Sequence, residues 1–176
     1  SLKTICNDAM RQKRRIHFLP PYRHDIKIQI FDLLGVHPVQ QKEAASMDLI
    51  KAVVKMRSTK EAQEIEELER ASVIGYKMHT TAMRLTKPGL TEKYVAGHVD
   101  GTANSYGAMV SFPTIFSQHG EIMHGSPSMS ELESGRLVLC DCGGETINNY
   151  CSDHTRTFPV NGKFTQRQLE IYSIVE

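Results

Sequence analysis

The sequence predicts an α+β protein in which helices pack on an antiparallel sheet. A long helical pattern comes first, because apolar residues recur at three- and four-residue steps from Ile65 to Leu85. Ser58 and Glu61 have the spacing of a capping box that would start this helix. Strand-like segments follow at residues 109–116, 136–143 and 150–158. Since the helices precede the strands instead of alternating with them, we expect separate helical and sheet layers.

The composition is that of an ordinary folded protein. Of the 176 residues, 40% are apolar and 23% are charged, which is enough to build a buried core. The net charge of +1 gives no basic field for nucleic acid, so no nucleic-acid partner is expected. No apolar stretch reaches the roughly 18 residues of a membrane span, and no signal-peptide pattern opens the chain. We therefore expect a cytoplasmic protein with no membrane partner.

Four cysteines are present, and three of them cluster at Cys140, Cys142 and Cys151. A secreted disulfide framework is usually denser and lies in a shorter chain, so we expect reduced cysteines buried in strands. A zinc site seeded by Cys140 and Cys142 is the alternative, although structural zinc sites commonly space their cysteines as C-x2-C.

The first part of the chain is predicted to be a separate region. We expect a short strand at 16–19, a helix at 26–34 and a linker at 37–45. Pro20 would end the strand because proline lacks a backbone donor, and Gly35 suits the C-cap of the helix. The domain boundary is placed near Ser46, between residues 1–45 and 46–176.

The second part begins with the long helix, which should end before Pro88. A second helix is expected at 91–100 and a loop at 101–107. A last helix opens at Thr165 and reaches Glu176 without a C-cap signal, which indicates a fragment of a longer protein.

Two aspartates carry the chemical signal. If the turn between the last two strands centres on Ile147, Asp141 lies directly opposite Asp153 on one face of the sheet. Opposed Cβ atoms are roughly 5 Å apart, and two ionised carboxylates at that distance repel each other. Three arrangements relieve the repulsion: a bound cation, a shared proton, or exposure to solvent at a sheet edge.

Among the eight histidines, His124 is the functional candidate, because it follows an apolar pair and lies shortly before the Asp141 strand. We expect His119 and His154 to be structural. His154 should point away from Asp153, toward the opposite face of its strand.

Five segments together resemble one known family, the pita-bread metallopeptidases, and most closely its Xaa-Pro aminopeptidases (aminopeptidase P) and prolidases. These segments are residues 111–115, 122–124, 137–145, 150–159 and 161–165. The resemblance covers about residues 46–176 and implies the first half of a pita-bread (creatinase/aminopeptidase-like) domain. Residues 1–45 resemble the tail of the creatinase-like domain that precedes it, together with a linker.

The resemblance implies hydrolysis of the N-terminal Xaa-Pro bond of proline-containing peptides by two divalent metal ions. Manganese is expected, and cobalt or zinc is possible. Asp141 would bind one metal and Asp153 would bridge both, while Thr155 would orient the bridging carboxylate. His124 would contact the substrate or the reacting centre, and Phe112 would lie in the substrate pocket.

The chain also departs from the family. It holds two of the five expected metal ligands, since the others belong to the second half of the domain, and the usual Asp-Ala-Gly is Asp141-Cys142-Gly143. We expect this chain alone to be inert and to form a homo-oligomer through its exposed sheet. The alternative function is a non-catalytic pita-bread module that binds peptides or proteins.

Overall fold

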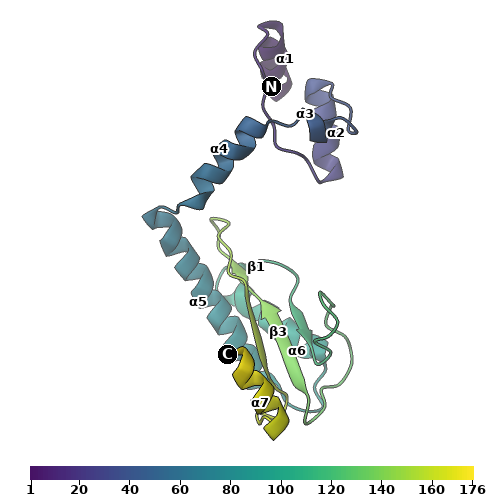
Figure 1. Ribbon diagram of the computed structural model, residues 1–176, viewed down its shortest axis with the longest axis vertical. Helices are drawn as coiled ribbons and strands as arrows, with labels where there is room; N and C mark the ends of the chain where they lie inside the picture. Colours follow the sequence, from purple (N-terminus) through teal and green to yellow (C-terminus); the bar gives the residue numbers. More distant parts are fainter. The chain divides into compact units, whose positions relative to one another are not determined.

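The computed structural model describes residues 1–176 and divides them into two compact units, Ser1–Lys60 and Glu61–Glu176 (Figure 1). The division falls later than the boundary expected near Ser46, because helix α4 (Met47–Ser58) belongs with the first unit although it buries none of its residues. The assignment of residues 1–45 to a creatinase-like domain stays a prediction.

The first unit is helical. Besides α4 it contains α1 (Leu2–Arg11), α2 (His24–Leu34) and α3 (Gln41–Ala44). The predicted C-cap is confirmed, since Gly35 takes a left-handed φ of 71° and its N–H donates to the Phe31 carbonyl.

The expected strand at 16–19 is wrong, because this segment finds no partner strand. It is held instead by single contacts to Ser46, whose N–H donates to the Phe18 carbonyl and whose hydroxyl lies 2.6 Å from His17 Nδ1. Part of the expected linker is likewise structured, since Gln41 is buried and its amide donates to the Lys27 and Val36 carbonyls.

The second unit opens with the predicted long helix, α5 (Ala62–Leu85). Its capping box is formed by Glu61 and Glu64 and not by Ser58 and Glu61. Ser58 still belongs to α4, where its hydroxyl donates to the Val54 carbonyl. The following helix, α6 (Glu92–Ser105), begins as expected, with Thr91 as its N-cap, but extends through most of the expected loop.

The strands form two small antiparallel sheets. One sheet pairs β1 (Met109–Val110) with β4 (Gly144–Glu145), and the other has the order β2-β3-β5. These three strands are β2 (Ile115–Ser117), β3 (Leu137–Cys142) and β5 (His154–Pro159). The predicted antiparallel sheet is therefore confirmed, although the segment 109–116 is divided between β1 and β2.

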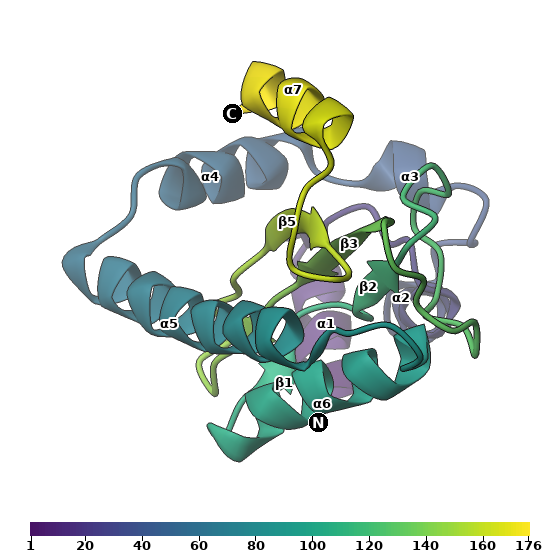
Figure 2. The ribbon, with the colours of Figure 1, turned by 90° about the horizontal axis from the view of Figure 1, so that it is seen from below.

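The two faces of the larger sheet have different surroundings. Helices α5 and α6 cover one face and form the core with it, while α7 (Gln166–Val175) lies on the other side (Figure 2). Alternate residues of β3 are buried, namely Val138, Cys140 and Cys142. The face that carries Asp141 is therefore turned away from α5 and α6. None of the helices combines the length and the apolar character needed to cross a membrane.

Candidate metal centre

The turn between β3 and β5 determines which side chains face each other. It closes between Thr146 and Tyr150, where the Thr146 N–H donates to the Tyr150 carbonyl at 2.9 Å. Asn149 takes a left-handed φ of 63° inside the turn. The turn consequently centres on Asn148, one residue later than the sequence pattern suggested.

The resulting register pairs Asp141 with Thr155. The predicted direct opposition of Asp141 and Asp153 is wrong, because moving the centre of the turn by one residue moves each pairing by two. A two-residue shift nevertheless keeps both aspartates on the same face, since strand side chains alternate with period 2. Asp153 itself is exposed and directly precedes β5, and diagonal neighbours across a strand pair are about 7–8 Å apart.

The Asp141 carboxylate has an unusual environment. The residue is half-buried, and its Oδ1 is buried without any hydrogen-bond partner. Buried carboxylate oxygens almost always have a partner, because an unpaired buried charge is costly. A cation would supply that partner, and carboxylates suit hard ions such as Mg²⁺ and Mn²⁺. The donor set on this face therefore fits a divalent metal ion.

Of the other predicted residues, Thr155 lies on this face and Phe112 lies shortly before β2. Thr155 is exposed opposite Asp141 and lines a groove of about 690 Å³ between β3, β5 and α7. Phe112 is half-buried in the segment between β1 and β2, next to Ser111, whose hydroxyl donates to the Ser152 carbonyl. This bond ties the Phe112 segment to the hairpin that carries the aspartates.

His124 makes no interaction with the aspartates. It is exposed in a turn and takes a left-handed φ of 58°. No hydrogen bond or ion pair joins it to Asp141 or Asp153 in this structure. Its proposed contact with substrate stays a prediction.

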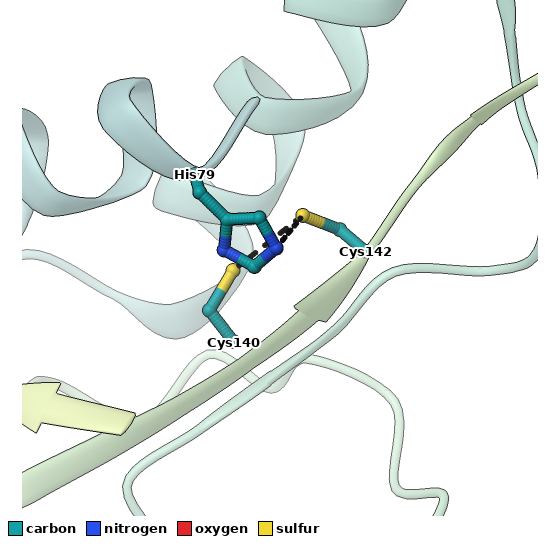
Figure 3. Close-up of side chains that lie close together, drawn as sticks. All are labelled: His79, Cys140 and Cys142. Atoms are coloured by element: carbon teal, nitrogen blue, oxygen red, sulfur yellow. Dashed lines mark hydrogen bonds between the residues drawn. The ribbon is translucent and has the colours of Figure 1, made fainter. Parts of the chain in front are cut away.

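The opposite face of β3 carries a cluster of two cysteines and one histidine, of which the sequence analysis considered only the cysteines. Cys140 and Cys142 are buried as expected, and His79 of α5 lies against them (Figure 3). The Cys140 thiol donates to the Cys142 sulfur, and this bond, with His79 nearby, lowers the pKa of Cys142 to about 6 despite burial. The same interaction raises the pKa of Cys140.

His79 could have been found from the sequence. It follows Gly75 by four residues and precedes Ala82 by three, so it shares the apolar face of α5. The expectation that His154 points away from the aspartate face is also met. A Cβ built at Gly75 of α5 would lie 3.4 Å from the His154 ring.

The second unit thus combines a helix-covered antiparallel sheet with two aspartates near its open face, and these offer oxygen ligands of the kind that hard metal ions prefer. The sequence profile of metallopeptidase family M24 matches residues 66–176. The chain belongs to this family, and its second unit is part of a pita-bread domain.

Known relatives agree with this assignment. The Xaa-Pro aminopeptidase of Escherichia coli (strain K12) is 42% identical over 135 residues, which are 75% of this chain and 30% of that protein. The solved structure of E. coli aminopeptidase P with the inhibitor Pro-Leu has a TM-score of 0.67 at 43% identity, over 70% of this chain and 29% of that one. Prolidase from Pyrococcus furiosus has a TM-score of 0.68 at 32% identity, over 78% and 42%.

The chain thus spans less than half the length of each of these relatives. The family profile begins within α5 and reaches Glu176. The matched region therefore includes both aspartates and all of the larger sheet.

Proposed function

We propose that this chain is part of a Xaa-Pro aminopeptidase, an enzyme that removes the N-terminal residue from peptides with proline in second place. The buried, unpartnered Oδ1 of Asp141 carries the proposal, because this atom lacks the partner that a metal ion would provide. The similarity to the E. coli Xaa-Pro aminopeptidase supports the choice of substrate class. Within this proposal, residues 46–176 form the first half of the catalytic domain.

Asp141 and Asp153 would hold a pair of divalent ions, with manganese expected before cobalt or zinc. Such a pair, when bound, polarises the peptide carbonyl and lowers the pKa of water so that it becomes a nucleophile near neutral pH. The chain's two aspartates supply hard oxygen donors, and the remaining ligands would come from outside these residues.

Other residues of the chain would position the reactants. Thr155, opposite Asp141 in the register, would orient the carboxylate of Asp153. His124 would contact the substrate from its exposed turn, and Phe112 would line the pocket for the peptide.

The proposal is tested by replacing Asp153 with Asn in the full protein. Mn²⁺-dependent cleavage of a peptide with proline second should fall by more than about 100-fold, because removing a ligand should cost more than removing one of its supports. Asp8→Asn, an exposed change in α1 of the first unit, is the matched control and should leave cleavage unchanged.

Full Mn²⁺-dependent cleavage by the Asp153→Asn protein would refute the assignment. A full protein that binds proline-containing peptides but cleaves none of them, with or without Mn²⁺, would favour the non-catalytic binding module instead.

A further inference from the structure

A second group of potential metal ligands lies on the covered face of β3. His79 from α5 and Cys140 and Cys142 from β3 bring their ligand atoms within 4.8 Å of one another. The two cysteines are 0% exposed and His79 is 6% exposed. The three side chains converge between the helix and the strand (Figure 3).

The distances match a site for one ion. The two sulfurs are 3.8 Å apart, and the Cys142 sulfur lies 3.5 Å from His79 Nε2. Ligands bound to one ion at about 2.3 Å for sulfur and about 2.0 Å for nitrogen would have about 3.8–4.0 Å between the sulfurs and about 3.5–3.7 Å between sulfur and nitrogen, from the tetrahedral angle to the 120° of a three-coordinate ion. The Cys142 sulfur therefore lies at such a separation from both the Cys140 sulfur and His79 Nε2, and all three ligand atoms lie within 4.8 Å of one another.

The imidazole of His79 supplies an independent observation. Its Nε2–H donates to the His154 carbonyl at 2.8 Å, which leaves the Nδ1 lone pair buried with no partner. A buried acceptor without a partner is unusual. The 3.5 Å distance to the Cys142 sulfur is measured from Nε2, so a cation in the cluster binds Nε2 after its proton has moved to the unpartnered Nδ1, and the hydrogen bond to the His154 carbonyl is given up.

We propose that His79, Cys140 and Cys142 bind one soft metal ion, Cu(I) in preference to Zn(II), between α5 and β3. Thiolate sulfur and imidazole nitrogen suit Cu(I) and zinc, whereas Mn²⁺ and Mg²⁺ prefer oxygen. Zinc in structural sites almost always takes four ligands. The cluster offers three, in a place where the side chains exclude water, and Cu(I) is satisfied with three.

The two faces of β3 would then bind different kinds of metal ion. Cys140 and Cys142 point toward α5, and Asp141 between them points the other way. Soft ions would bind on the covered face and hard ions on the open face. The soft ion would also join α5 to β3 and stabilise the fold by mass action. This inference does not depend on the proposed peptidase activity.

The test is a competition for Cu(I). The full chain, reduced and metal-free, is titrated under anaerobic conditions against Cu(I) held by a coloured chelator. The wild-type chain should withdraw one Cu(I) with high affinity, and added Zn(II) at equal concentration should not displace it. Cys140→Ser and Cys142→Ser should each weaken the binding by more than about 100-fold, since outer partners alone cost up to that much.

Cys151→Ser is the matched control, because Cys151 is an exposed free thiol on the same hairpin. It should withdraw Cu(I) as the wild type does. Wild-type affinity in Cys140→Ser or Cys142→Ser, or equal loss in Cys151→Ser, would overturn the site. Displacement by Zn(II) would overturn the preference for Cu(I).

A second measurement keeps the test decisive if a serine variant fails to fold. X-ray absorption of the Cu(I)-loaded wild-type chain should show two sulfur neighbours and one nitrogen neighbour. A shell of oxygen and nitrogen alone, or one with more than two sulfurs, would contradict the assignment.

Discussion

Two carboxylates in this chain, Asp141 and Glu92, show how a structural acid differs from a potential ligand. Glu92 is 2% exposed, and its oxygens accept four hydrogen bonds from the hydroxyls of Ser117 and Ser128 and the N–H groups of Gln118 and Ser128. Asp141 has one buried oxygen with no partner at all. The first carboxylate has all its partners within the chain, whereas the second keeps one buried oxygen that no group of the chain satisfies.

Glu92 leads to a prediction about stability. Burial alone would raise its pKa, but the hydrogen bonds from Ser128, Ser117 and the backbone lower the pKa below its usual value. A group whose pKa is lower in the folded state stabilises the fold above the pKa of the unfolded chain, and this stabilisation is lost as the pH falls through the folded pKa. Glu92→Gln should cost about 3 kcal/mol at neutral pH, because it leaves buried donors unpaired.

The measurement is urea unfolding of the 176-residue chain between neutral pH and acid. The wild type should lose stability on acidification more steeply than Glu92→Gln. Glu66→Gln, an exposed change on α5, is the control and should stay within about 0.5 kcal/mol of wild type. Equal stability of Glu92→Gln and wild type at neutral pH would show that the network contributes nothing.

At the residue scale, the sequence identified Asp141 and Asp153 as candidate ligands but did not predict which residues lie opposite them. Both aspartates could be recognised because Asp141 stands in an apolar strand, where a carboxylate is unusual, and Asp153 comes directly before the next strand. Which residue lies opposite Asp141 depends on a turn whose centre is set by the left-handed Asn149 and by one backbone bond. Nothing in the pattern of apolar residues distinguishes a turn at Ile147 from one at Asn148.

At the scale of elements, the hairpin of β3 and β5 depends on close backbone approach. A Cβ added to Gly143, just after β3, would lie 1.8 Å from the Ser152 carbonyl oxygen and 2.5 Å from Ser111 Oγ. One of these neighbours is backbone and cannot move aside. The glycine thus lets the end of β3 approach the opposite strand beside the Asp153 position.

Gly143→Ala should therefore destabilise the chain by about 3 kcal/mol, at the upper end of what overpacking usually costs. Gly97→Ala is the matched change, because Gly97 lies in α6 with no atom near its added Cβ. It should stabilise the chain by about 0.5–1 kcal/mol, since alanine favours the helix. Thermal unfolding followed by circular dichroism compares them, and a Gly143→Ala chain as stable as Gly97→Ala would contradict this account.

Helices were easier to predict than strands in this chain. The predicted helices α2, α5 and α6 are all present and differ only at their ends, as at Ser105 of α6. Helices α1, α3 and α4 were not predicted, and α3 lies within the expected linker. Strands need partners that lie far away in the sequence. The segment 16–19 has strand-like residues but no neighbour to pair with, and the segment 109–116 is divided because β1 pairs with β4 while β2 pairs with β3.

At the scale of the whole molecule, one sheet presents two chemically different faces. The face against α5 and α6 is apolar apart from the His79 cluster, and the other face carries the aspartates beside a groove under α7. The α+β layering could be predicted from the sequence, as could the place of His79 on the apolar face of α5. The cysteine and histidine cluster could not, because helix packing alone brings His79 to Cys142.

The central claim is that this open face binds divalent metal through Asp141. The most direct measurement is calorimetric titration of Mn²⁺ into the metal-free full protein, beside its Asp141→Ala and Glu66→Gln variants. The wild type and Glu66→Gln should bind Mn²⁺ alike, and Asp141→Ala should lose most of the binding. Mn²⁺ binding by Asp141→Ala with the stoichiometry and affinity of the wild type would contradict the account.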